Sequence, residues 1–396
     1  MELLEGRDRT GPRHRRLISL LLKKICQVIL LLISFPLTLL RKATFSTKDV
    51  GRIVISATHI GLGNAVLMTP LLRTLKSNFG GVQIYVLTNS AACKAFFERL
   101  SCIDGVVSLK IPKGNELLGG IKAYLDGVRL LKPDVYISHF LHDLVDFSIW
   151  GFFSGAKYRI TYNNYVDGCL DTFFLTNDKR KHDVDRNLEI ARFLGAKEIL
   201  KDLGYIKLEK DEIDHAEEFL GTTGRNARIT IVGIHPGCDK KNKHKRWPIE
   251  RFIYVAKMLS ENKDIKVIFF IGPDEKDLLP KLNSVKHGQI MISSDKTFGQ
   301  DMALISKCNL FLSNDSGLMH IAATFKIPII ALFGATSPNK YRPWRTPHTI
   351  IQHVDKTAFN GTDFCDDTES IQRISTEEVT NELSRFIDVL SSHATL

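Results

Sequence analysis

Cysteine is scarce in this sequence of 396 residues, and the seven cysteines are scattered without a Cys-x-x-Cys pair. An odd number without paired spacing is not typical of a disulfide framework and favours a reducing, cytosolic environment. No group of histidines and cysteines has the spacing of a zinc site, so we expect no structural metal and no metal cofactor. Hydrophobic residues make up 44% and charged residues 25%, which indicates a folded protein with room for two domains.

An excess of basic over acidic residues is also lacking outside two short segments. The net charge is +10, but residues 1–42 contain nine Lys/Arg against three Asp/Glu, which gives +6. Residues 239–246 contain five against one, which gives +4, so the two segments account for the whole excess. Proteins that bind nucleic acids carry extended basic surfaces, and no basic groove studded with aromatic residues is left over. We therefore expect no nucleic-acid partner.

A long uninterrupted hydrophobic run is missing as well. The apolar stretch near the N-terminus is interrupted by Lys23 and Lys24, and its continuous part, Ile25–Leu40, spans roughly 24 Å as a helix. A bilayer core is about 30 Å thick, and Pro36 would bend the segment. The small residues of a signal-peptide cleavage site are lacking. We predict that residues 1–45 form a basic and apolar helix lying on an anionic membrane surface; a transmembrane helix and a soluble core helix are the alternatives.

Short apolar runs alternate with helical patterns through the rest of the chain, which predicts parallel sheets in an α/β fold. Residues 46–224 form the predicted N-terminal domain, in which a strand and a glycine-containing turn precede the helix Ala65–Asn78. In that turn Gly61 and Gly63 are spaced like the first two glycines of a dinucleotide fingerprint, but Val66 occupies the third position. The turn therefore does not indicate a dehydrogenase.

The second predicted domain covers residues 225–345 and begins after the loop-like sequence Gly221–Asn226. Its first element, Ile229–Ile234, is a β-branched run typical of a buried strand. Residues 346–396 form a C-terminal tail with a predicted helix, Thr376–Ser391.

The stretch from Leu312 to Trp344 combines a strand, a polar turn, a helix and a second strand. In such units ligands bind beyond the carboxyl ends of the parallel strands. The amides of Ser316 and Gly317 at the start of the helix suit an anion such as a phosphate. Alternatively this is an ordinary capped helix in which Asp315 or Ser316 only supplies the cap.

Three segments in a fixed order carry a resemblance to a known family. They are IGLGNAVLMTPLLRTLK near the start, HPGCDKKNKHKRWPIERF in the middle, and NDSGLMHIAA followed by PIIALFGATSPNKYRPW. Together they resemble the signature of glycosyltransferase family 9, the bacterial heptosyltransferases of lipopolysaccharide synthesis. The resemblance covers roughly 52–344 and implies the GT-B fold, two doubly wound Rossmann-like domains facing a cleft. It also implies that the first domain binds the acceptor and the second a nucleotide-sugar.

The resemblance places the donor site on two loops. By position, the lysine of the family that contacts the diphosphate corresponds to Lys245, next to Lys243 and Arg246, although a solvated basic loop is the plainer alternative. The donor loop and the start of its helix correspond to Asp315, Ser316, Gly317 and His320. His320 is alternatively a core histidine, and its expected role is the weakest.

The same family uses an aspartate directly after a glycine in the first turn as the general base. Here Asn64 occupies this position, and an asparagine does not accept a proton at neutral pH. A substitute base must reach the acceptor oxygen. The candidates are His59 in the same turn, then His139 after the fourth predicted strand, and then Asp143. Asn64 is expected to orient the acceptor through its amide.

The sequence as a whole predicts a membrane-associated glycosyltransferase at the cytoplasmic face of the bacterial inner membrane. Its donor would be a nucleoside-diphosphate sugar, with heptose as the sugar that the resemblance implies. The acceptor would be a lipid-linked glycan such as the lipopolysaccharide core or an O-antigen. The alternatives are a nucleotide-sugar binding protein that has lost its base and a nucleotide-sugar epimerase of the same fold.

Overall fold

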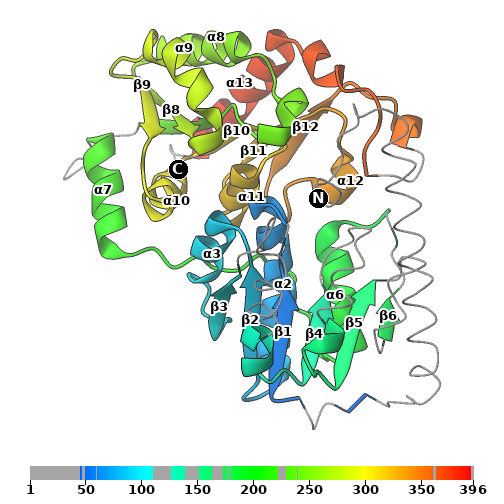
Figure 1. Cartoon of the computed structure of the whole chain (residues 1–396). Coiled ribbons are helices and arrows are strands. Elements are labelled where there is room, and N and C mark those ends of the chain that lie inside the picture. Colours follow the sequence, from blue (N-terminus) through cyan, green and yellow to red (C-terminus); the bar gives the residue numbers. More distant parts are fainter. Residues whose placement is uncertain are drawn as a thin grey trace, which may run out of the picture.

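The computed structural model describes residues 45–46, 50–58, 60–109, 126–138, 151–162, 173–175, 178, 180–221, 229–238, 240–359 and 363–393 (Figure 1). The predicted membrane-associating segment lies outside these residues except for Phe45. Among the helices that are described, none combines the length and the apolar character needed to cross a membrane. The Phe45 ring packs on Tyr158 of the first domain with 4.9 Å between ring centroids.

The N-terminal domain contains a six-stranded parallel sheet with the order β3-β2-β1-β4-β5-β6. The strands are β1 (Arg52–Ser56), β2 (Gln83–Thr88), β3 (Gly105–Ser108), β4 (Val135–Ser138), β5 (Tyr158–Tyr162) and β6 (Phe173–Leu175). The helices of this domain are α2 (Leu62–Asn78), α3 (Ala91–Phe97) and α6 (Asp183–Phe193). The chain winds outward from β1 in both directions, so the strand order reverses between β1 and β4, where α/β domains of this type bind ligands.

The C-terminal domain repeats this topology in a second parallel sheet, with the order β12-β11-β10-β7-β8-β9. The strands are β7 (Thr230–His235), β8 (Ile265–Ile271), β9 (Ile290–Ser294), β10 (Leu310–Asn314), β11 (Ile329–Phe333) and β12 (His348–Gln352). The helices are α8 (Ile249–Ser260), α9 (Leu279–Asn283), α10 (Phe298–Ser306), α11 (Gly317–Thr324), α12 (Pro338–Tyr341) and α13 (Thr376–His393), and α7 (Lys210–Leu220) joins the domains. The predicted fold of two doubly wound domains is confirmed, and its switch points lie at β1/β4 and β7/β10.

Several expected boundaries differ from the structure. Helix α2 begins at Leu62, three residues earlier than expected, so Gly63 and Asn64 belong to its first turn and not to the preceding loop. Pro70 is the ninth residue of this helix. Strands β5, β6 and β12 and helices α7, α9 and α12 were not predicted.

Pro70 is tolerated inside α2 because other groups bind the backbone oxygens that it affects. A proline cannot donate the usual bond to the carbonyl four residues earlier. That carbonyl belongs to Val66, and it accepts a hydrogen bond of 2.7 Å from the side chain of Thr69. The next carbonyl, that of Leu67, accepts a bond of 3.1 Å from Asn187 of α6. The helix therefore continues through the proline, and the hydrogen bond from Asn187 joins α2 to α6.

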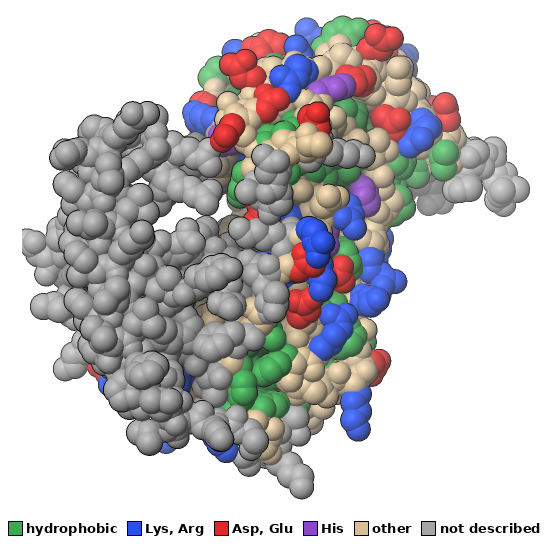
Figure 2. Space-filling model, turned by 90° about the vertical axis from the view of Figure 1, so that its right-hand side faces the viewer, with side chains coloured by type: hydrophobic (Ala, Val, Ile, Leu, Met, Phe, Trp, Pro, Cys, Tyr) green, Lys and Arg blue, Asp and Glu red, His purple; other side chains and the backbone are tan. Residues whose placement is uncertain are grey.

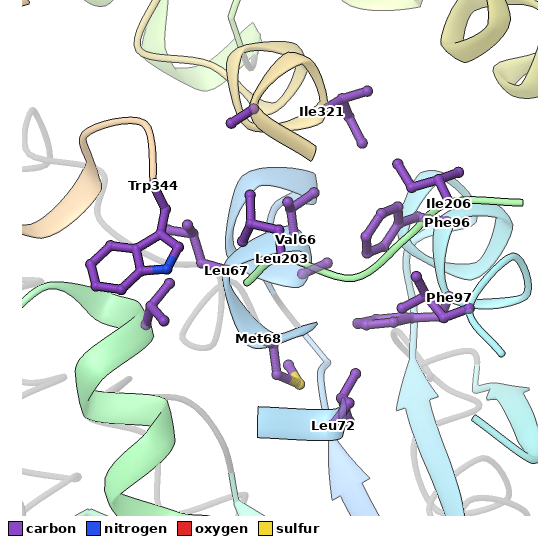
Figure 3. Packing of buried hydrophobic residues seen from close by; sticks show 14 of the residues in the cluster. Val66, Leu67, Met68, Leu72, Phe96, Phe97, Leu203, Ile206, Ile321 and Trp344 are labelled. Atoms are coloured by element: carbon purple, nitrogen blue, oxygen red, sulfur yellow. The ribbon is translucent and has the colours of Figure 1, made fainter. Parts of the chain in front are cut away.

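The two domains share one hydrophobic cluster (Figure 3). Val66 and Leu67 on α2 lie below Ile321 on α11, and all three side chains are fully buried. Trp344 extends from the C-terminal domain to the N-terminal one, where its indole nitrogen donates a hydrogen bond of 2.7 Å to the carbonyl of Lys201. Burial of apolar area across this junction stabilises one relative arrangement of the domains.

Helix α6 meets the segment after α12 in a second part of the junction. The His182 ring stacks on Trp344 with 4.4 Å between centroids, and its Nε2 lies 2.9 Å from the carbonyl oxygen of Arg342. Below it Asp183 accepts a bond of 2.7 Å from Arg186, and Lys340 lies 3.9 Å from the same carboxylate. Because these charges are buried, each of them depends on its partner.

The described surface carries charges of both signs. On the face shown in Figure 2, Lys and Arg side chains are interspersed with Asp and Glu.

Candidate active site at the domain junction

The turn between β10 and α11 is built by side chains that bind backbone groups. Ser316 caps α11, and its hydroxyl accepts a hydrogen bond of 3.4 Å from the amide of Met319. Asn314 accepts a bond of 3.1 Å from the amide of Trp247 and donates one of 2.8 Å to the carbonyl of Pro236. One asparagine thus holds the β7 loop and the Trp-Pro pair against the start of α11, at the switch point of the sheet.

Lys245 and Asp315 form an ion pair at this turn. The Lys245 Nζ lies 2.9 Å from Asp315 Oδ2, and the two side chains are only 13% and 10% exposed. An ammonium has three protons, so after binding the carboxylate it can still donate to the oxygens of a phosphate. The amides at the start of α11 lie beside Asp315 and add further donors for an anion.

The other predicted basic residues have different surroundings. Arg246 donates to the carbonyl oxygens of Cys238 and Asp274, each at 3.0 Å, so its guanidinium holds the β7 and β8 loops together. Lys243 is exposed and pairs with Asp277 at 3.1 Å. Of the three cations, Lys245 is therefore the one that points to the start of α11.

Glu275, after β8, is a buried carboxyl group that the sequence analysis missed. It is 4% exposed, and its Oε2 accepts a bond of 3.0 Å from the amide of Gly272. Burial raises its pKa to about 7, against the lowering effect of Arg246. A Cβ on Gly237 would lie 2.2 Å from this side chain, so the glycine permits the close approach. The available signal was an acidic residue just after a strand at the edge where ligands bind, in a sequence that looks like an ordinary turn.

Helices α2 and α11 follow the switch-point strands β1 and β10, and their N-terminal ends meet, with α11 directly above α2 in Figure 1. A Cβ on Gly63 would lie 2.7 Å from His320 Cδ2, and a Cβ on Gly317 would lie 3.0 Å from the Cβ of Leu62. A methyl group at position 63 would therefore displace the His320 ring, and one at position 317 would make a tight contact with Leu62. Asn64 is the third residue of α2 and half-buried, so the residue in the position of the family's base lies beside the donor loop.

His320 lies inside this contact and is 3% exposed. Burial lowers its pKa to about 4, which makes the ring neutral at physiological pH, and nearby Asp315 has the opposite effect. Its Nδ1 has no hydrogen-bond partner among the described residues. Because the His320 ring is neutral, the positive potential at this contact comes from the two helix N-termini and Lys245.

Three candidates for the base, His59, His139 and Asp143, lie outside the described residues, so they remain predictions. Within the described part of the chain, no cluster of three or more His, Cys, Asp or Glu side chains is arranged to hold a metal ion. The five cysteines in that part are all free thiols.

Two doubly wound domains that meet at their switch points, with a lysine and a helix start on the donor side, are the arrangement of a GT-B glycosyltransferase. A model of glycosyltransferase family 9 (heptosyltransferase) matches residues 153–362, and the chain belongs to this family. It is therefore a glycosyltransferase.

Relatives of known function agree with this assignment. Lipooligosaccharide heptosyltransferase 2 of Campylobacter jejuni is 26% identical over 304 residues, which cover 74% of this chain and 84% of the relative. Lipopolysaccharide heptosyltransferase 2 of Salmonella typhimurium is 24% identical over 313 residues, covering 74% and 86%.

Solved structures show the same fold. A family 9 glycosyltransferase from Veillonella parvula superposes with a TM-score of 0.71 at 20% identity, covering 87% of this chain and 99% of that one. The E. coli ADP-heptose lipopolysaccharide heptosyltransferase II gives a TM-score of 0.68 at 18% identity, covering 86% and 99%.

Proposed function

We propose that this protein transfers heptose from ADP-heptose to a hydroxyl group of a lipid-linked lipopolysaccharide core. The observation that carries the proposal is the buried Lys245–Asp315 pair at the start of α11, with Asn64 and α2 directly opposite. The donor and acceptor chemistry follows the relatives, which are named as heptosyltransferases of lipopolysaccharide or lipooligosaccharide. One of the superposed structures is named for ADP-heptose.

The described groups supply one half of the reaction. The bond between the sugar's anomeric carbon and the β-phosphate oxygen breaks, and negative charge develops on the departing ADP. Lys245 and the amides of Ser316 and Gly317 stabilise that charge because they are held in place before the reaction begins. No metal is needed for this step, and we expect full turnover after exhaustive treatment with EDTA.

The other half is the attack of the acceptor. Its hydroxyl oxygen forms the new bond to the anomeric carbon, and its proton passes to a base. Asn64 offers an amide that orients the hydroxyl. We propose that the proton goes to His59, with His139 second and Asp143 third, since an ordinary histidine pKa of about 6.5 suits a base at neutral pH.

The test is turnover of ADP-heptose with purified core acceptors of increasing length, measured as ADP release and as glycosylated product. The proposal expects product only when donor and acceptor are both present. Conversion of the donor without an acceptor would instead indicate an epimerase. Absence of product with every acceptor, although ADP-heptose binds, would indicate a binding protein.

Variants assign the base in the same assay. Replacing the base with alanine should lower turnover by roughly a hundredfold or more while donor binding is retained. The three alanine variants of His59, His139 and Asp143 are compared with Asn64→Asp. If all three remain active, none of them is the base; if only Asn64→Asp turns over, the natural protein is a binding protein.

We further propose that residues 1–42 attach the enzyme to the cytoplasmic face of the inner membrane. The support is their net charge of +6 beside the apolar stretch Ile25–Leu40. A chain beginning at Thr44 keeps Phe45, whose ring packs in the first domain, and should retain its melting temperature and nucleotide binding. It should no longer sediment with anionic lipid vesicles, and persistent sedimentation would contradict the proposal.

A further inference from the structure

Residues 363–365 form a short strand-like segment at the carboxyl end of β11. Phe364 makes an antiparallel bridge with Thr336. On either side, the amide of Ser337 donates to the carbonyl of Asp363 at 3.0 Å, and the amide of Cys365 donates to the carbonyl of Ala335 at 2.9 Å. The backbone of Phe364 is thus fixed at the edge of the sheet where ligands bind.

The neighbours of Phe364 are anchored while its own side chain is exposed. Asp363 pairs with the buried Lys340 at 2.5 Å, and Cys365 is only 6% exposed. Phe364 is 37% exposed, although a large apolar side chain in a fixed segment would gain free energy from burial. The anchored backbone therefore holds a partly exposed aromatic ring beside the ligand site.

The ring of Phe364 lies beside the donor lysine. The Lys245 Nζ is 5.3 Å from the centre of the ring, and the ring of Tyr341 supports Phe364 at 6.5 Å between centroids. A phosphate bound to Lys245 would therefore lie close to the aromatic ring. A group attached to that phosphate would then be within reach of Phe364.

The strand order places Phe364 at one end of the donor site. Phe364 belongs to the end of β11, whereas the buried carboxyl of Glu275 follows β8. In the order β11-β10-β7-β8 these two residues lie on opposite sides of Lys245 and Asp315, which occupy the ends of β7 and β10. A carboxyl group at this edge of the sheet suits the hydroxyls of a ribose. We therefore place the nucleoside on the Glu275 side and the sugar on the Phe364 side.

We propose that Phe364 is the apolar wall on which the sugar ring of the donor packs, so that it distinguishes a nucleotide-sugar from the free nucleotide. A sugar presents C–H groups on one face and hydroxyls at its edge. The aromatic ring suits the face, and the Asp315 carboxylate accepts hydrogen bonds from the edge. This inference rests on the proposed function of the Lys245 site.

A structural role for Phe364 makes a different prediction. If its ring only holds Lys245 through a cation–π contact, loss of the ring would weaken binding of the free nucleotide and of the nucleotide-sugar equally. If the ring contacts the sugar, its loss affects the nucleotide-sugar alone. The comparison of the two ligands therefore separates the two roles.

The experiment measures the affinity of ADP and of ADP-heptose by calorimetry for the full chain and its variants. Phe364→Ala should weaken ADP-heptose by about 3- to 10-fold, the range for a lost aromatic contact, and leave ADP within about twofold. Phe364→Leu, which keeps apolar volume and secures the fold, should show the same selective loss in smaller measure. Phe364→Tyr should bind both ligands as the natural protein does.

A matched control is Tyr254→Ala, which removes an aromatic side chain, 59% exposed, from α8 and should change neither affinity. Equal weakening of both ligands in Phe364→Ala, or no change in either, would overturn the inference while the donor site stands. Failure of the natural protein to bind either ligand would overturn the donor site itself, and this inference with it.

Discussion

Replacing Lys245 with alanine removes the cation that we assign to the diphosphate. The Lys245 ammonium is held 2.9 Å from Asp315, with only 13% of its side chain exposed, so its side chain loses little further entropy when a ligand binds. A hydrogen bond to a charged group is worth about 1.5–3 kcal/mol. ADP affinity should therefore fall by about 10- to 150-fold, since about 1.4 kcal/mol corresponds to a factor of ten.

The partner of Lys245 sharpens this prediction. In Lys245→Ala the carboxylate of Asp315, 10% exposed, loses its cation and stands close to the bound phosphates. Two negative charges about 5 Å apart repel each other by several kcal/mol at an effective dielectric constant of about 20, before solvent and relaxation reduce the effect. The double variant Lys245→Ala, Asp315→Asn lacks this repulsion and should regain on the order of 1 kcal/mol of ADP affinity.

Calorimetric titration of ADP into the two variants and the natural protein tests both statements. Lys243→Ala is the control, because this exposed lysine pairs with Asp277 and is expected to change the affinity by less than about threefold. Unchanged ADP affinity in folded Lys245→Ala would remove Lys245 from the site. A double variant weaker than the single one would refute the role of Asp315 as a fixed counter-charge.

Three further outcomes are expected. Gly63→Ala places a methyl group 2.7 Å from the facing histidine of α11 and should slow turnover by roughly tenfold or more, whereas Gly61→Ala, with open space around it, should have little effect in the same kinetic assay. Lys340→Met should lower the free energy of unfolding by about 3 kcal/mol in urea, because it removes a buried cation from the half-buried Asp363 and from the buried Asp183, which keeps Arg186; Lys281→Met, from an exposed pair, should cost less than about 1 kcal/mol. Burial lowers the pKa of His182 to about 3, so only the unfolded state takes up its proton below about pH 6.5, and stability falls with pH there; the stability lost in His182→Gln at pH 7 should therefore shrink at pH 5.

The strand–turn–helix units were predictable because each carries a local pattern. Buried parallel strands such as β7 are continuous β-branched runs, and the polar turn before α11 interrupts such a run abruptly. The resemblance placed Lys245 and Asp315 in one donor site, but their ion pair was not predicted, since the two residues are far apart in sequence. Only the strand order brings the ends of β7 and β10 together.

The missed elements lack such patterns. Strand β6 has three residues and β12 carries polar residues at both ends, so neither reaches the length or the apolar content of a core strand. The position of Pro70 deep inside α2 was not predictable, because one of its compensating hydrogen bonds comes from Asn187 on another helix. Phe364 stands in a segment without periodicity, and its position depends on a bridge to a distant loop.

The repeated topology explains why the reactive position lies at the junction and in neither domain alone. Helix α2 follows β1 and α11 follows β10, so each begins at the switch point of its domain, and the contact of Gly63 with His320 brings these two starts together. In the proposed reaction the donor's anomeric carbon lies near Asn64, since α11 carries the phosphate donors and α2 begins opposite. A carboxylate at position 64 would gain from the positive end of α2 and stay ionised, whereas the asparagine carries no charge that this field could stabilise. In the proposed reaction, proton transfer therefore falls to a residue other than Asn64.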